Sequence, residues 1–473
     1  MTDPRPILLW FRRDLRLADH PALTAACATG RPIIPLFIYD QVTAAQGAAP
    51  RFRLSLSVRA LAKDLTAMGS RLILRRGDAL TVLEDVIGET GADAVYWSRQ
   101  YDVMAKERDV PLKAALKGQG VAVRSFPGHL LFEPWTVSTK TGGFYRVYTP
   151  MWRMVRDRDV PAPLPRPTKL TPPADWPQGD DLSNWQMDKD MWRGREIVAS
   201  HCQVGEAVAQ DRLNEFVDKD IAKYQSQRDL PAVKGTSGLS ENLTYGEISP
   251  ATCWHAGWAA LRDGKADAEV FLKELVWREF AYHLSHHTPH IETENWKPDW
   301  DAFPWNTDPT TPKVRAWKQG RTGIPFVDAA MREMYVTGTM HNRGRMIVAS
   351  YLTKHLMTHW KVGQLWFAEC LIDWDPASNA MGWQWSAGSG PDATPYFRVF
   401  NPVTQLDKFD KEHTYADRWI AEGQLDPPKT ALSYFDAVPE SWGLSPRDLY
   451  PNPIVPADQG RRIALDAYEN RGF

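Results

Sequence analysis

The sequence predicts an α/β N-terminal domain with a parallel, five-stranded, doubly wound sheet, followed by an all-α C-terminal domain. In the first 130 residues, short continuous apolar runs alternate with helix-like segments, which is typical of a parallel sheet covered by helices on both faces. After residue 205 the pattern changes to long amphipathic segments with few β-rich runs, which indicates helices. A length of 473 residues also exceeds what one hydrophobic core usually supports, so we expect more than one domain.

The strands expected in the sheet are short. They are Ile7–Phe11, Ile33–Ile38, Leu72–Leu74, Ala94–Trp97 and Val121–Phe126. The helices expected between them lie near Pro21–Ala28, Arg51–Met68, Thr81–Glu89 and Ala105–Lys117. No G-x-G-x-x-G motif follows the first strand, where the sequence reads RRDLRLADHP, so we do not expect this domain to bind NAD.

A proline-rich stretch separates the two domains. Residues 159–181 contain seven prolines and cannot form a long helix. The stretch could be a mobile linker or an ordered loop packed on both domains. We therefore assign residues 1–132 to the α/β domain, 133–204 to a connector and 205–473 to the helical domain. The helices expected in the last part are Ala268–His286, Val327–Met334 and a long one that opens at the motif MHNRGRM and runs to Trp360.

Composition excludes some classes of protein. Lys and Arg number 56 against 58 Asp and Glu, so a nucleic-acid site would need locally clustered basic residues. The four cysteines are scattered, without a C-x-x-C pair or a histidine at metal-ligand spacing. We therefore expect no disulfide framework, no metal site and a cytoplasmic location. The first apolar run, Ile7–Phe11, is too short for a signal peptide or a membrane span.

The chain contains 21 tryptophans, many of them in its second half. Such rings can serve as bulky filler of a large core. They can also stack on bases or carry electrons, and composition alone does not decide between these roles.

Two segments suggest a ligand site near the start of the helical domain. Tyr224–Arg228 precedes the run Gly235–Ser240, whose small residues could direct backbone N–H groups at a phosphate. An ordinary helix cap is the alternative, since Thr244–Glu247 also matches a capping box.

A predicted helix at 271–280 carries a carboxylate between two aromatic residues. Spacing of three places Phe271, Glu274 and Trp277 along one face. Because an unpaired buried carboxylate is costly, this face suggests a pocket in which Glu274 binds a ligand N–H and Trp277 stacks on a flat ring. Alternatively, a partly exposed Glu274 pairs with Arg278 or a neighbouring helix.

Two further motifs offer polar groups. Residues 340–346, MHNRGRM, supply donors for phosphates and base edges, or else form a solvated helix start. Residues 373–385 hold two Asp, an Asn and three Trp. Gly388–Gly390 is too isolated to be a nucleotide loop.

Taken together, these motifs resemble the DNA photolyase and cryptochrome family. WFRRDLRLADHPAL, TSGLS, ELVWREF, TGIPFVDAAMREM, MHNRGRM and DWDPASNAMGWQW occur in the family's order and cover nearly the whole chain. The chain looks most like the microbial cyclobutane pyrimidine dimer photolyases of the group that includes classes I and III. The resemblance implies an FAD-binding helical domain, a monomeric lyase, and light-driven repair of UV-damaged DNA by electron transfer from reduced FAD to a flipped-out dimer.

The resemblance carries a set of cofactor residues onto this sequence. Those implied around FAD are Tyr224, Thr236, Ser237, Gly238, Leu239, Ser240, Phe271, Arg345, Asp373, Trp374, Asp375 and Asn379. Arg345 matches the arginine paired with the first acidic residue, and Asn379 the residue facing flavin N5. The implied electron chain is Trp383, Trp360 and Trp305, with Trp296, Trp300 and Trp317 as substitutes for the last.

The implied lesion and DNA residues are Arg228, Glu274, Trp277, Asn342, Arg343, Met346 and Trp385. Glu274, Asn379, Asn342 and Arg345 are the expected catalytic residues. Asn379 and Glu274 favour repair over a cryptochrome-type photoreceptor. A (6-4) photolyase is a further alternative.

The first domain resembles the family's antenna domain. Where folate-binding class I relatives carry Asn-Glu, this chain has Met104 and Ala105. The second chromophore therefore stays open between methenyltetrahydrofolate held in another way and 8-hydroxydeazaflavin.

Overall fold

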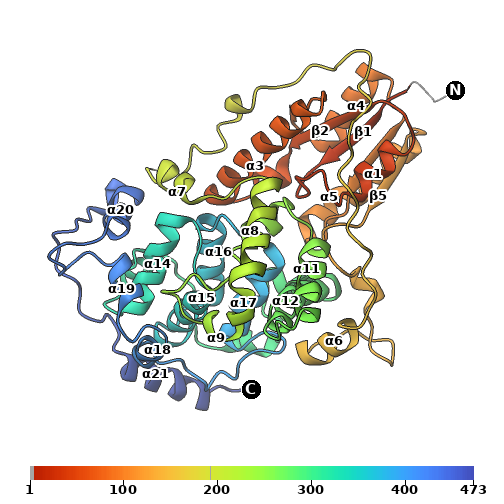
Figure 1. Ribbon diagram of the computed structural model, residues 1–473. Helices are drawn as coiled ribbons and strands as arrows, with labels where there is room; N and C mark the ends of the chain where they lie inside the picture. The colour runs from red at the N-terminus through yellow and green to blue at the C-terminus, as the bar shows by residue number, and fades with distance from the viewer. Residues whose placement is uncertain (1–4, 192) are drawn as a thin grey trace.

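The structure is a computed structural model that describes residues 5–191 and 193–473. Its N-terminal part contains one parallel sheet of five strands in the order β3-β2-β1-β4-β5 (Figure 1). The strands are β1 (Ile7–Phe11), β2 (Ile33–Tyr39), β3 (Ile73–Arg76), β4 (Ala94–Ser98) and β5 (Ala122–Phe126). The predicted α/β fold is confirmed.

Helices on both faces explain why these strands are continuously apolar. Ile7, Leu9 and Phe11 of β1 enter one hydrophobic core, while Leu8 and Trp10 enter the other. Side chains alternate along a strand, so every residue of β1 is buried. The covering helices are α1 (Pro21–Cys27), α2 (Gln41–Ala44), α3 (Ala48–Ala67), α4 (Ala79–Thr90) and α5 (Val103–Gly118).

The proline-rich stretch is an ordered loop that touches both parts. Its backbone bonds to the sheet domain through Leu164 O, which accepts from Asp19 N at 2.8 Å, and Thr171 O, which accepts from Ile33 N at 2.9 Å. On the other side, the His255 ring of the helical part lies 3.0 Å from Val160 O. Of the two alternatives, the ordered loop is the one present.

The remainder of the described chain is helical. Its short helical turns are η1 (Pro134–Thr136), η2 (Leu182–Trp185), η3 (Ile221–Lys223), η4 (Pro289–Glu292), η5 (Pro298–Ala302), η6 (Tyr351–His355) and η7 (Glu440–Trp442). Its α-helices are α6 (Tyr148–Val155), α7 (Arg195–His201), α8 (Glu206–Lys219), α9 (Tyr224–Gln227), α10 (Ser240–Tyr245), α11 (Pro250–Arg262), α12 (Ala268–His287), α13 (Pro312–Lys318), α14 (Pro325–Thr337), α15 (Asn342–Ser350), α16 (Trp360–Cys370), α17 (Pro376–Ala387), α18 (Pro402–Phe409), α19 (Thr414–Trp419), α20 (Lys429–Ala437) and α21 (Ala457–Glu469).

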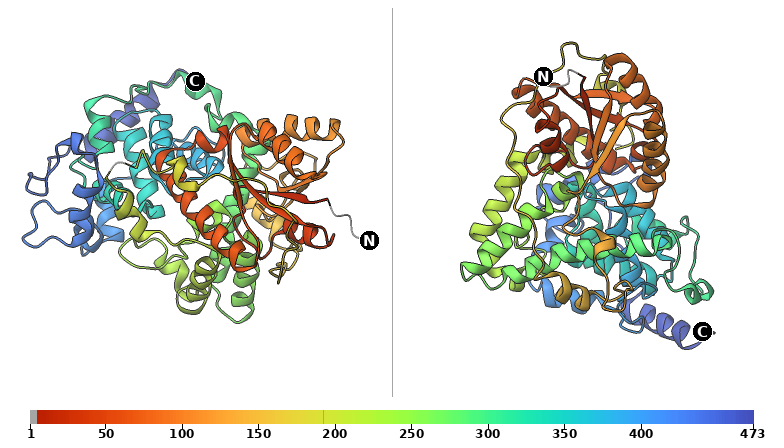
Figure 2. Two further views of the ribbon diagram at one scale, coloured as in Figure 1. Left: turned by 90° about the horizontal axis from the view of Figure 1, so that it is seen from above. Right: turned by 90° about the vertical axis from the view of Figure 1, so that its right-hand side faces the viewer.

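The helical part packs against one end of the sheet domain, and α21 lies on the side of the helical part that is farthest from the sheet (Figure 2, right). Its largest core contains many of the tryptophans, among them Trp300, Trp305, Trp317, Trp360 and Trp383. Core filling therefore accounts for much of the tryptophan content. Among the described helices, none combines the length and apolar character that crossing a membrane requires.

The prediction of one long helix from residue 340 to Trp360 is wrong. α15 ends at Ser350, η6 is a π-helical turn, and α16 begins only at Trp360. Between η6 and α16, the backbone of the chain bonds to Asn306. The Asn306 N–H donates to Met357 O at 2.7 Å, and the Asn306 carbonyl accepts from His359 N at 2.8 Å. These bonds replace helical ones, and Met357 adopts a left-handed φ of 48°.

Candidate functional site

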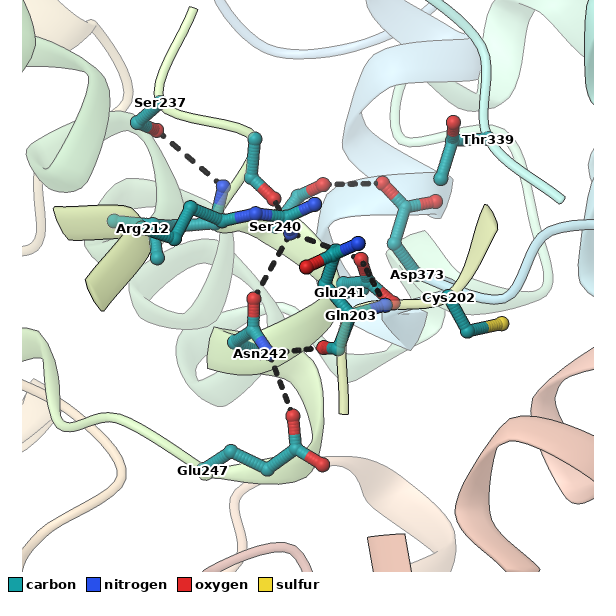
Figure 3. A network of polar contacts seen from close by, with 12 residues as sticks. Cys202, Gln203, Arg212, Ser237, Ser240, Glu241, Asn242, Glu247, Thr339 and Asp373 are labelled. Atoms are coloured by element: carbon teal, nitrogen blue, oxygen red, sulfur yellow. Dashed lines mark hydrogen bonds and ion pairs between the residues drawn. The ribbon is translucent and has the colours of Figure 1, made fainter. Parts of the chain in front are cut away.

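Three separate motifs meet at Asp373. The Arg345 guanidinium on α15 donates to both carboxylate oxygens of Asp373, at 3.0 and 2.8 Å. The Ser240 hydroxyl, which opens α10, donates to the same carboxylate at 2.6 Å (Figure 3). Asp373 is 7% exposed, so its carboxylate is largely removed from water, whereas the Arg345 side chain is only partly buried. The expected Arg345–Asp373 pair is thus formed, and the small-residue loop ends beside it.

A cation that the sequence analysis did not single out supports this loop. Arg212 on α8 donates to the carbonyl of Gly238, to Glu241 at 2.9 Å and to Asn242 Oδ1 at 3.0 Å (Figure 3). Gly238 has φ +62°, and a Cβ there would approach the guanidinium to 3.4 Å. The loop needs glycine at this point because a side chain would be strained and crowded.

The second acidic residue, Asp375, is held by the other domain. It caps α17 by accepting from Ser378 N at 2.9 Å, and it also accepts from the Tyr282 hydroxyl. Arg13, which follows β1, lies 3.5 Å away. Burial alone would raise the pKa of Asp375, but Arg13 and Arg278 hold it below its ordinary value. Asp375 is therefore a carboxylate at neutral pH.

The residues around these two carboxylates fit a bound flavin. Asn379 is half-buried and donates through Nδ2 to Gln364 O at 3.0 Å. The indole N–H groups of Trp374 and Trp383 are buried and, within the described part of the chain, have no hydrogen-bond partner. Buried donors without an acceptor are costly. A cofactor with carbonyl, ring-nitrogen and phosphate acceptors would match these donors and the arginine.

Two aromatic residues that the resemblance implies around the cofactor lie near each other. Tyr224 on α9 and Phe271 on α12 are both buried, with ring centroids 6.2 Å apart in an edge-to-face arrangement. Phe216 contacts both rings, at 5.4 and 5.0 Å. Residues distant in the sequence thus share one apolar surface.

The three tryptophans of the expected electron chain are linked through helix α16. Trp360 is the first residue of α16, and Trp383 packs on the backbone of Gly363, which lies about one turn further along the same helix. The His359 ring lies 5.3 Å from Trp360 and 5.2 Å from Trp305.

The proposed substitutes for the third position occupy different places. Trp300 stacks on Trp305 at 5.5 Å, whereas Trp317 lies 6.1 Å from Trp383. Trp296 bonds to Thr288 Oγ1 through its indole N–H, at 3.2 Å.

On the expected lesion side, both arginines that are expected to contact DNA are paired with acidic residues. Arg228 forms an ion pair with Glu274, and Arg343 lies 2.7 Å from Asp229. Glu274 thus pairs with a neighbouring helix rather than with Arg278, which donates to His129 O at 2.8 Å instead.

The remaining lesion residues stay at least partly open. Asn342 is exposed, and its Nδ2 lies 3.9 Å from Met346 Sδ. Trp277 and Trp385 are half-buried. Such side chains remain accessible to a ligand.

Sequence reasoning missed Arg212 and the role of Arg13. Their partners lie far away along the chain, so no local spacing reveals them. Only the WFRRDLR motif, which contains Arg13, gave a signal through the resemblance. For a metal, the described residues provide no group of three or more His, Cys, Asp or Glu that could hold one.

Comparison with known proteins identifies the family. The chain is 45% identical over 470 residues to the deoxyribodipyrimidine photo-lyase of Agrobacterium fabrum, covering 98% of this chain and 97% of the relative. The chain belongs to the DNA photolyase and cryptochrome family. Residues 7–168 match the family described as DNA photolyase, and residues 271–470 match the FAD binding domain of DNA photolyase. The helical part is therefore an FAD-binding domain.

Other members of the family are similar to different degrees. Cryptochrome-2 of Arabidopsis thaliana is 32% identical, over 97% of this chain and 78% of its own length. The crystal structure of a bacterial class III photolyase from Agrobacterium tumefaciens matches with a TM-score of 0.90 and 43% identity, over 99% of this chain and 98% of that one. Within the photolyase and cryptochrome family, the chain is thus more similar to this photolyase than to the plant photoreceptor.

Proposed function

We propose that this protein is a deoxyribodipyrimidine photo-lyase that repairs cyclobutane pyrimidine dimers in UV-damaged DNA. The observation that carries the proposal is the meeting of Ser240, Arg345 and Asp373 at one point. It joins three motifs of the family into one polar cluster, on a chain whose relatives include several named deoxyribodipyrimidine photo-lyase.

We propose that FAD lies against this cluster. The loop 236–240, fixed by Arg212, would hold the pyrophosphate, and Arg345 would balance negative charge on the flavin while Asp373 keeps its guanidinium in place. Asn379 would present its amide to the flavin ring, with its orientation set by Gln364 O. When bound and reduced, FAD supplies the electron that light sends to the dimer and that returns after the ring splits.

The lesion side of the site is proposed to work by exchange of partners. In the structure, Arg228 forms an ion pair with Glu274. A phosphate that attracts Arg228 would release Glu274 to bind the dimer, while Trp277 and Trp385 offer surfaces for stacking. Photolyases are a known example of enzymes that take the target base out of the helix, and the unstacking costs least at a damaged site.

For electron supply from the surface, we propose the order Trp305, Trp360, Trp383. The His359 ring, in contact with both Trp305 and Trp360, supports Trp305 over Trp300 at the outer position. Replacing Trp305 by Phe should slow light-driven reduction of bound FAD more than the same change at Trp300. Transient absorption measures both rates.

For the antenna, we propose a folate held outside the crevice of the sheet. In doubly wound sheets, ligands bind at the carboxyl ends of the strands where the order reverses, here between β1 and β4. In this chain Arg12 pairs with Asp109, and Arg108 with Asp40, both at 2.6 Å, at that edge. A deazaflavin in this crevice would have to displace these pairs. Chromatography of the chromophore released by acid identifies it, and a released deazaflavin would contradict this proposal.

The function is tested with oligonucleotides that carry one defined lesion. Reduced, FAD-loaded protein should remove a cyclobutane dimer only under illumination and should leave a (6-4) lesion intact. Glu274→Gln should lower the repair yield about tenfold or more, because a charge-assisted hydrogen bond to the dimer is lost. The Glu440 side chain is 81% exposed, so Glu440→Gln is the matched control, and this variant should repair the dimer normally.

Other outcomes of the same experiment have clear meanings. FAD-loaded protein that leaves the cyclobutane dimer unrepaired in the light would contradict the proposed repair activity and favour a photoreceptor. Repair of the (6-4) lesion alone would show that the class of lesion is wrong.

A further inference from the structure

Tyr148 lies flat against the tryptophan proposed to stack on the lesion. Its ring centroid is 3.8 Å from that of Trp277, and the two planes differ by only 4°. The Tyr148 hydroxyl donates to Lys273 O at 2.7 Å, one turn before Trp277 on the same helix. Tyr148 is 7% exposed, so both its ring and its hydroxyl are held in place.

The backbone of Tyr148 reaches a second wall of the same region. Its N–H donates to Asp392 Oδ2 at 3.0 Å. Asp392 has a left-handed φ of 48°, unusual for a residue other than glycine, and lies in the loop that follows α17. In that loop Thr394 N bonds back to Trp385 O at 3.2 Å. One residue of α6 therefore contacts the helix of Trp277 and the loop attached to Trp385.

We infer that Tyr148 is a positioning residue for the lesion, which rests on the proposed function. Trp277 stays half-buried, so Tyr148 covers part of its surface and leaves part open. A ring already ordered by a stacked neighbour loses less rotational freedom when a base binds to it. Tyr148 thereby favours lesion binding without touching the lesion. Through its bond to Tyr148, Asp392 holds the loop attached to Trp385 at a fixed position relative to Trp277.

A purely structural role for α6 makes a different prediction, and the helix offers a matched control. Trp152 on α6 is also buried, but it packs edge-to-face on Trp254 at 6.4 Å. Trp152→Leu should loosen α6 as much as Tyr148→Leu does. Only the latter removes the ring that lies on Trp277.

The first test compares affinities of the FAD-loaded protein for dimer-containing and undamaged oligonucleotides at one fixed salt concentration. Tyr148→Leu should weaken binding of the dimer about tenfold, the scale of one base-stacking contact, and leave undamaged DNA unaffected. Tyr148→Phe keeps the stacked ring and should lose no more than about threefold, as one neutral hydrogen bond allows. Repair at saturating dimer should stay at the wild-type rate in both.

The second test does not depend on DNA. In protein labelled with 5-fluorotryptophan, the ¹⁹F resonance of Trp277 is assigned by its loss in Trp277→Phe. Tyr148→Leu should shift and broaden this resonance, whereas Tyr148→Phe and Trp152→Leu should leave it close to that of the wild type.

The possible failures are distinguishable. An unchanged Trp277 resonance in Tyr148→Leu, or an equal loss of dimer affinity in Trp152→Leu, overturns the role of Tyr148. If the wild-type protein binds dimer-containing and undamaged DNA equally, the proposed function is overturned. The role of Tyr148 in lesion binding then falls as well, even if Tyr148→Leu shifts the Trp277 resonance.

Discussion

Asp373 concentrates the polar contacts of the candidate site on one side chain. Its partners Ser240 and Arg345 lie 133 and 28 positions away in the sequence. A buried carboxylate that accepts several charge-assisted hydrogen bonds fixes the positions of its donors as well as its own. The family resemblance predicted the pair with Arg345, whereas the bond from the Ser240 hydroxyl to Asp373 was not predicted.

Asp373→Asn tests this carboxylate. The substitution keeps the size of the side chain but leaves Arg345 without its counter-charge, so the affinity for FAD should fall about tenfold. The ratio of flavin to protein absorbance after gel filtration measures the loss. Asp308→Asn, which alters an exposed residue that bonds within its own loop, should retain FAD as the wild type does. Equal retention by both variants would contradict the importance of Asp373.

Helices α16 and α17 approach closely because one of them carries a glycine at the contact. A Cβ on Gly363 would lie 2.0 Å from the ring of Trp383, far inside van der Waals contact. The six-membered ring of the indole therefore rests directly on the helix backbone. This contact links Trp383 to the helix that Trp360 begins, and no periodic pattern in either helix predicts it.

Gly363→Ala should push Trp383 out of place. We expect a loss of about 1–3 kcal/mol of stability from overpacking, together with slower light-driven reduction of FAD. Thermal unfolding and transient absorption measure the two effects.

Gly382→Ala is the control on α17. A Cβ there meets open space, so the change should be neutral or stabilise by up to about 1 kcal/mol. A stable Gly363→Ala variant with normal photoreduction would contradict the proposed contact.

The stability of the whole molecule depends on charged groups that are buried where the two domains meet. Arg53 of α3 is fully buried and donates to Glu241 at 2.8 Å and to Glu247 at 2.8 and 3.0 Å. Glu241 directly follows Ser240, so this contact fastens the sheet domain to the loop proposed to bind phosphate. Without Arg53, Glu247 would be buried without a counter-charge, which is strongly unfavourable, whereas Glu241 would keep its pair with Arg212.

Arg53→Ala should therefore destabilise the protein by about 3–5 kcal/mol, because it leaves Glu247 buried without a counter-charge and leaves Glu241 with Arg212 alone. Calorimetric melting measures the change. Arg75→Ala breaks a more exposed pair with Glu89 and should cost no more than about 1 kcal/mol. Similar midpoints for the two variants would show that the interface tolerates the loss.

The protein as a whole should lose stability in acid. Burial lowers the pKa of His283 to about 3 and those of His286, His341, His355 and His359 to about 4. As the pH falls from about 6.5 toward 4, the unfolded chain therefore binds protons that the folded chain refuses, and the free energy of unfolding decreases. Burial also raises the pKa of Glu279 and Glu292 to about 7 and raises those of Asp328 and Glu333, which favours the folded chain at low pH. Burial lowers the pKa of His129, His201 and His287 as well, so these four carboxyl groups oppose eight histidines.

The midpoint of thermal unfolding between pH 7 and 4.5 checks this expectation. His355 is buried and its pKa is lowered to about 4, so His355→Gln should flatten the pH dependence. A midpoint that rises toward acid would contradict the assignment of the histidines as neutral.

The sequence by itself determined the doubly wound sheet, because strands buried on both faces must be apolar throughout, as Ile7–Phe11 is. Together with the family resemblance, it also named most of the candidate site. Only the tertiary structure decided that the helix after Met340 becomes π-helical after Ser350 and ends at His355, that Asp375 is held by Arg13, and that Tyr148 lies on Trp277. Those features arise from contacts between residues far apart along the chain, and local periodicity carries no information about such contacts.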